Sequence, residues 1–191
     1  MSSLRSVVLS HPRTPAHPKP AMPFSDMPDA ARLWVYAADR PLSDDEEKAL
    51  TDRLEDFLSD WTSHGRPVEG AAEVRNGRFV LLAAHRPDAE NGSTNADVSG
   101  CGIDASVHVL ESFADETGVE WESGLRVFYR DADGAVRSAG RPAFAERAQR
   151  GEVDASTSVF DLGVDTVADL RAGRFERPAA TSWHAEAFPL S

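Results

Sequence analysis

The sequence predicts an α+β protein whose centre is a ferredoxin-like β-α-β-β-α-β core, an antiparallel sheet with two helices on one face. Three observations support this class. The predicted elements follow in the order strand, helix, strand, strand, helix, strand over about residues 32–138. Asn76-Gly77 is a strong signal for a two-residue hairpin turn. Each of the two helical segments carries an apolar stripe that can cover a sheet.

The first strand and the first helix have clear local signals. Residues 32–38 read Arg-Leu-Trp-Val-Tyr-Ala-Ala, an aromatic and β-branched run typical of a strand. Ser43 and Glu46 form a capping-box pattern that predicts a helix start. The helix continues with an apolar stripe, Leu50, Leu54, Phe57, Leu58 and Trp61, and we expect it to end before Gly65.

The hairpin and the second helix follow. Residues 70–75 and 78–84 form the two arms of the hairpin, and the second arm is continuously apolar, as in a strand covered on both faces. Residues 87–100 are polar and aperiodic, which predicts a long loop. The second helix is expected to begin between Gly102 and Ala105 and to end at Gly118.

The C-terminal part adds shorter elements. Strands are expected at 125–129 and 135–137 around an Asp-Gly turn, and the chain from 141 onward suggests two short helices, one extended segment and an irregular tail. We therefore divide the chain into a flexible Pro-rich tail (1–25) and a single α+β domain (26–191), with its core at about 32–138 and an extension at about 139–191.

Composition excludes several classes of function. The 191 residues carry a net charge of −12, which disfavours nucleic acids and anionic membrane surfaces and also matches proteins adapted to high salt. The acidic surface has two interpretations: it binds a basic partner, or it is simply solvated. The sequence has one cysteine and no apolar run long enough to span a membrane, so we expect a cytoplasmic protein without disulfides.

Motifs for nucleotide and metal chemistry are missing from the sequence. It contains no GxxxxGK[ST] loop, no GxGxxG after a strand, no HExxH, no paired CxxC and no GxSxG. A P-loop ATPase is therefore excluded, and we expect no cofactor and no metal. The sequence does not decide whether the protein is an enzyme, although the missing motifs favour a protein without catalytic activity.

The most informative stretch is Gly100-Cys101-Gly102, before the second helix. Glycines allow a ligand to approach the backbone closely, and free N–H groups at a helix start stabilise anions or a thiolate. In the alternative interpretation, Asp104 is an N-cap or first-turn acid that neutralises the dipole of this helix end in place of a ligand. Cys101 is accordingly either a nucleophile or, more simply, an inert small residue.

Two histidines distant in sequence are candidates to complete this site. His64 follows Trp61, and His184 follows Trp183, so each imidazole has an aromatic neighbour near a chain bend. The alternative is that each Trp-His pair is structural and that its imidazole forms a hydrogen bond with a helix end. His108 is too far along the helix from Cys101 and instead suits a surface pair with Glu111.

Several phrases together resemble a family of small uncharacterised bacterial proteins, some of which carry the automatic name "ABC transporter ATPase". These phrases include Leu33-Trp-Val-Tyr36, Trp61-Thr-Ser-His-Gly65, Gly100-Cys-Gly-Ile-Asp104, Thr157-Ser-Val-Phe160 and Ser182-Trp-His184. The resemblance covers about residues 32–188 and implies a family but no activity. Gly102 stands where family members carry serine, and many carry arginine at the position of His108.

Three functions follow from these observations. The first is a cytoplasmic domain that binds a small anionic ligand or a peptide at the Gly100-Cys101-Gly102 loop, lined by Asp104, the Trp61 and His64 pair and the Trp183-His184 pair. The second is a thiol-dependent enzyme with Cys101 as nucleophile and His64 or His184 as base. The third is a non-catalytic interaction domain that forms a homodimer through its sheet.

Overall fold

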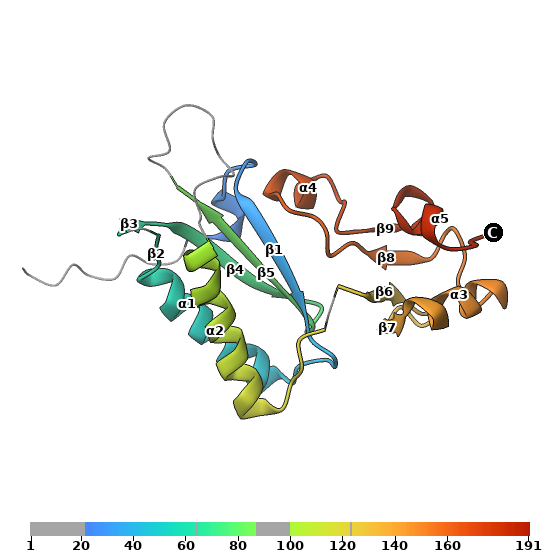
Figure 1. Ribbon diagram of the computed structural model, residues 1–191, viewed down its shortest axis with the longest axis horizontal. Helices are drawn as coiled ribbons and strands as arrows, with labels where there is room; N and C mark the ends of the chain where they lie inside the picture. Colours follow the sequence, from blue (N-terminus) through green and yellow to red (C-terminus); the bar gives the residue numbers. More distant parts are fainter. Residues whose placement is uncertain (1–21, 64, 87–99, 123) are drawn as a thin grey trace, which may run out of the picture.

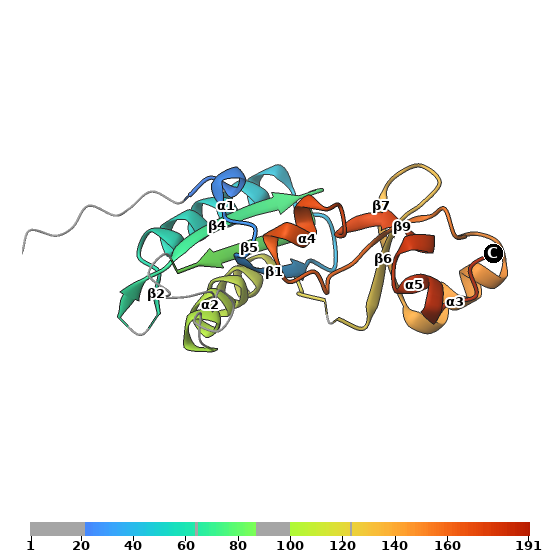
Figure 2. The same ribbon diagram turned by 90° about the horizontal axis from the view of Figure 1, so that it is seen from above.

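The computed structural model describes residues 22–63, 65–86, 100–122 and 124–191 and is a mixed helix and antiparallel-sheet structure, so the α+β class is confirmed. The N-terminal half holds a three-stranded sheet of order β1-β5-β4, with the long helices α1 and α2 on one face (Figures 1 and 2). Its elements are η1 (Phe24–Asp26), β1 (Arg32–Ala37), α1 (Asp44–Ser59), β2 (Thr62–Ser63), β3 (Arg66–Pro67), β4 (Glu69–Arg75), β5 (Phe79–His85) and α2 (Gly100–Thr117).

The C-terminal half forms a second sheet of order β7-β6-β8-β9, with α3 and α5 beside it (Figure 1). Phe144 of α3 is fully buried against Tyr129 and Phe188, and these rings centre the core of this half. The elements are β6 (Arg126–Arg130), β7 (Val136–Gly140), α3 (Arg141–Gln149), β8 (Ser158–Phe160), α4 (Val167–Arg171), β9 (Glu176–Pro178), η2 (Ala179–Thr181) and α5 (His184–Ala187).

Local sequence signals explain the boundaries of the N-terminal elements. The Ser43 hydroxyl accepts from the Glu46 N–H (3.3 Å) and the Glu46 carboxylate accepts from the Ser43 N–H (2.8 Å), which confirms the capping box. Asn76 and Gly77 have φ of 54° and 57°, as the expected tight hairpin turn requires. Gly118, with φ of 70°, follows the last residue of α2.

The four-stranded ferredoxin-like sheet does not form. The order β1-β5-β4 is the one expected for its first three strands, but the fourth expected strand, β6, pairs with β7 and β8 instead. Among the described residues, the place beside β1 holds only single bridges at its two ends, from Trp121 to Ala38 and from Thr166 to Arg32. The hairpin with β7 and the burial of Phe128 against Phe79 favour the second sheet for this segment.

One apolar cluster is shared by the two larger sheets. Phe79 of β5 contacts the rings of Phe128, Phe160 and Phe175 from the second half, with centroids 4.7–5.3 Å apart. Beside this cluster the guanidinium of Arg78, 5% exposed, donates to the carbonyl oxygens of Ala38, Asp39 and Val136 and to Ser138 Oγ. Aromatic packing and one buried cation therefore join the two halves.

Two further expectations concern the periphery. The predicted N-terminal tail lies almost wholly outside the described residues, as does nearly all of the polar 87–100 segment. No described helix has both the length and the apolar character needed to cross a bilayer.

The extension contains one strand that the sequence did not indicate, β9, which pairs with β8 where an irregular segment was expected.

Candidate functional site

The Gly100-Cys101-Gly102 segment is helical rather than a loop. Helix α2 begins at Gly100, so these residues form its first turn. Asp104 is therefore too far along the helix to be an N-cap or first-turn acid, and it is exposed. The Cys101 side chain lies outside the described residues, and its reactivity and its role in anion binding stay predictions.

The residue Trp61 belongs to the core at the end of α1. It is 4% exposed and packs with Leu58, Val68 and Leu82, and its ring centroid lies 5.0 Å from that of Phe57. This packing accounts for the burial of the Trp61 ring, while its indole nitrogen has no hydrogen-bond partner among the described residues. His64, predicted to share a site with it, lies outside the described residues.

Trp183 and His184 lie at the other end of the molecule. They belong to the α5 region, which is separated along the longest axis from the start of α2 in both views (Figures 1 and 2). The structure therefore does not bring His184 to Cys101, and the expected shared pocket does not form between them. The fourth strand does not lie beside β1, so the chain carries its C-terminal elements away from the helices.

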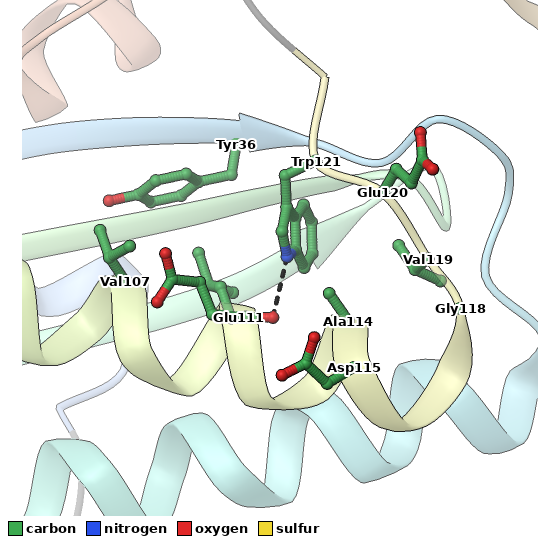
Figure 3. A pocket seen from close by; sticks show the side chains of 10 residues that line it. Tyr36, Val107, Glu111, Ala114, Asp115, Gly118, Val119, Glu120 and Trp121 are labelled. Atoms are coloured by element: carbon green, nitrogen blue, oxygen red, sulfur yellow. Dashed lines mark hydrogen bonds between the residues drawn. The ribbon is translucent and has the colours of Figure 1, made fainter.

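A groove occupies the surface between β1, the C-terminal half of α2 and the segment that follows this helix. Its volume is about 730 Å³. Figure 3 shows the ring of Tyr36 facing Val107, with the indole of Trp121 standing between the sheet and the helix. Its full lining is Tyr36, Val107, Leu110, Glu111, Ala114, Asp115, Gly118, Val119, Glu120 and Trp121.

Backbone and side-chain hydrogen bonds hold the far wall of the groove in place. The Trp121 indole N–H donates to the Leu110 carbonyl of α2 over 2.9 Å. The same segment is fastened to the end of β1, since the Asp39 N–H donates to the Glu120 carbonyl and the Glu122 N–H donates to the Ala37 carbonyl, both over 2.8 Å. The indole is thus fixed without help from a ligand.

The groove is rich in carboxylates. Glu111 Oε2 lies 3.2 Å from the Nδ1 of exposed His108, the surface pair that the spacing predicted. The carboxylates of Asp115 and Glu120 have no ion pair or hydrogen bond with any residue that the structure describes. Burial raises the pKa of the Tyr36 phenol, and a hydrogen bond with Ser106 partly opposes this, so the phenol is neutral at pH 7.

This arrangement suits binding of a cation. Aromatic faces attract cations, and carboxylates without partners add charge complementarity. Within the described part of the chain, no cluster of three or more histidine, cysteine, aspartate or glutamate side chains could hold a metal ion.

The sequence contained one overlooked signal for this groove. Glu111 and Asp115 are four residues apart on one helix, a spacing at which like charges repel. Trp121 follows six residues later, beyond the glycine that ends the helix. This acidic pair followed by an aromatic residue is the part of the groove that the sequence alone displays.

Comparison of the chain with protein-family models, curated proteins and solved structures finds no match.

Proposed function

We propose that the protein is a non-catalytic binding module that recognises a basic peptide segment, with a lysine or arginine side chain seated between Tyr36 and Trp121. The observation that carries this proposal is the groove of about 730 Å³, which combines these two aromatic walls with the carboxylates of Asp115 and Glu120. Its volume lies within the range of small-ligand sites, about 300–1,000 Å³.

The energetics support a cationic ligand over an anionic one. A cation against an aromatic face gains about 0.5–2 kcal/mol, depending on how far it is desolvated. A ligand cation also relieves the repulsion between Glu111 and Asp115. The net charge of −12 accelerates the approach of basic partners and slows that of acidic ones.

Binding can be tested with matched single-residue probes. N-acetyl-lysine amide and N-acetyl-arginine amide are titrated against the protein, with N-acetyl-glutamine amide as the neutral reference, and the indole N–H signal of Trp121 is followed by NMR. We expect a Kd in the millimolar range for the basic probes, about 4 kcal/mol of binding free energy, and at least fivefold weaker binding of the neutral one.

The variant Asp115→Asn with Glu120→Gln removes both unpaired charges and should weaken binding of the basic probes about tenfold. It should leave the protein as stable or slightly more stable, because the repulsion within α2 is also removed. The matched control, Glu55→Gln with Asp133→Asn, removes two exposed acids outside the groove. Equal binding of all three probes, or equal weakening in both double variants, would refute the proposal.

A further inference from the structure

A hollow in the C-terminal half lies where the chain enters β6 and leaves β8. Its volume is about 360 Å³, and its lining includes Gly124, Arg126, Phe160, Asp161, Leu162 and Trp183. We propose that a second copy of this chain fills the hollow with its Leu125 side chain, so that two copies form a symmetric dimer. The inference does not depend on the groove at Tyr36 and Trp121.

The side chain of Leu125 projects from the rim of this hollow. Its two neighbours in the chain, Gly124 and Arg126, belong to the lining, whereas Leu125 does not. Leu125 is 69% exposed, and within the described part of the chain it is the one large apolar residue that is exposed. Burial of this side chain in an apolar hollow of a partner removes its surface from water and therefore favours association.

The walls of the hollow are apolar and are held in place by the packing behind them. Phe160 is 2% exposed, and its ring centroid lies 4.7 Å from that of Phe79. Leu162 packs partly buried against the same core cluster. Trp183 is stacked on His184, with centroids 3.8 Å apart. A preformed hollow of this kind can accept an apolar anchor residue at little ordering cost, as at the centre of protein interfaces.

The charged residues of the lining are already paired within one copy. Arg126 Nε lies 3.2 Å from Glu122 Oε1, and the Asp161 carboxylate accepts from Arg177 Nη2 over 3.2 Å. Neither Arg126 nor Asp161 therefore requires a charged group from a ligand. An apolar side chain fits this lining better than an ion does, because it leaves both pairs undisturbed.

The distribution of net charge also favours association through this half of the molecule. Residues 124–191 contain nine arginines, no lysine and ten aspartates or glutamates, and account for −1 of the net charge of −12. Residues 1–123 carry the remaining −11, and the helices α1 and α2 belong to this acidic part. Two identical copies therefore repel each other least when they approach through their C-terminal halves.

The position of Leu125 beside the hollow determines the symmetry of the assembly. When a projecting residue and its receptor are neighbours on one surface, a two-fold axis between two copies seats both projecting residues at once. Each copy then contributes the same surface, and association stops at the dimer. A receptor on a distant surface would instead produce open chains of copies.

Sedimentation equilibrium of the full chain tests the proposal. We expect a monomer–dimer equilibrium with a Kd in the micromolar range, as for a small interface. Leu125→Ser should raise this Kd at least about hundredfold, because each dimer loses two buried leucines. The matched variant Leu125→Met keeps an apolar side chain of similar size and should change the Kd less than about fivefold. Both variants replace an exposed residue, so the monomer should remain folded.

A mixture of two variants separates this contact from nonspecific association. Leu162→Gln makes the hollow polar but keeps Leu125, and it should weaken its homodimer as Leu125→Ser does. Each of these homodimers lacks both contacts. The heterodimer keeps one, with Leu125 of the Leu162→Gln copy in the intact hollow of the Leu125→Ser copy. We therefore expect the mixture to associate at least about tenfold more tightly than either variant alone.

Three results would overturn the proposal: a wild-type chain that stays monomeric up to millimolar concentration, an unchanged Kd in Leu125→Ser, or a mixture that associates no more tightly than its components. Species that keep growing with concentration would overturn the two-fold arrangement. Circular dichroism checks that Leu162→Gln is folded. If it is not, the comparison of wild type with Leu125→Ser and Leu125→Met still decides.

Discussion

Replacing Arg78 with methionine tests how the two sheets are joined. The side chain keeps most of its length but loses all its donors, so four acceptors lose their partner: the carbonyl oxygens of Ala38, Asp39 and Val136 and the Ser138 hydroxyl. The cation–π contact with Phe128, 5.1 Å from the guanidinium carbon to the ring centroid, is also lost. Burial lowers the pKa of Arg78, but the side chain remains charged.

The expected loss of stability follows from these contacts. Asp39, Val136 and Ser138 are half-buried, so water can replace Arg78 there. The Ala38 carbonyl is buried, and a buried acceptor left without a partner costs about 1–3 kcal/mol. Loss of the cation–π contact adds to this cost, and removing the desolvation cost of the guanidinium offsets part of it. We expect a net loss of about 2 kcal/mol, or about 4–8 °C in Tm.

Urea unfolding followed by tryptophan fluorescence and circular dichroism measures this change. Arg137→Met is the matched control, because the Arg137 side chain is exposed and its ion pair with Asp131 should contribute less than about 1 kcal/mol. Arg78→Lys keeps the charge but not the fork of donors, and should fall between wild type and methionine. A loss below about 1 kcal/mol for Arg78→Met would refute the account of Arg78 as a joint between the sheets.

Two further predictions concern His184 and Gly70. Burial lowers the pKa of His184 to about 4, from 6.5 in the unfolded chain, so below pH 6.5 the unfolded state binds the extra proton. The free energy of unfolding should therefore fall as pH drops from about 6.5 to about 4, by at most about 3 kcal/mol, and His184→Gln should remove this slope in urea titrations. A Cβ at Gly70 would lie 2.5 Å from Leu58 Cδ2 and 2.9 Å from Trp61 Cε3, so Gly70→Ala should destabilise the protein by about 1–3 kcal/mol in the same assay.

A specific result would contradict each of these two predictions. A pH slope that persists unchanged in His184→Gln would assign it to carboxylates instead. Gly124→Ala serves as the control for Gly70→Ala, because a Cβ there meets nothing within 4 Å. If the two alanine variants were equally stable, the packing of Leu58 and Trp61 over Gly70 would be looser than the structure indicates.

Elements governed by short-range chemistry were predictable. The capping box at Ser43, the Asn76-Gly77 turn and the stop at Gly118 all depend on residues within a few positions of one another. The surface pair of His108 with Glu111 was predictable for the same reason. The start of α2 was misplaced by several residues, because glycines at 100 and 102 were interpreted as a loop although they are compatible with a first helical turn.

The candidate site was far less predictable. The sequence analysis placed Trp183 and His184 in one binding site with Cys101. The fold separates the α5 region, to which they belong, from the start of α2, where Cys101 lies (Figure 1). The groove at Tyr36 and Trp121 brings together a strand, a helix and a connection that are far apart in sequence. Only its acidic pair, Glu111 and Asp115, was visible beforehand as an unfavourable spacing.

By itself, then, the sequence determined the α+β class, the acidic surface and the positions of most helices and strands, because hydrophobic period, caps and turns act locally. The tertiary structure alone decided which strands share a sheet. Strand β6 could have lain beside β1, but its hairpin with β7 and the packing of Phe128 on Phe79 hold it in the second sheet. Such choices depend on the summed burial of distant side chains, which no local pattern encodes. They also created the groove on which the proposed function rests.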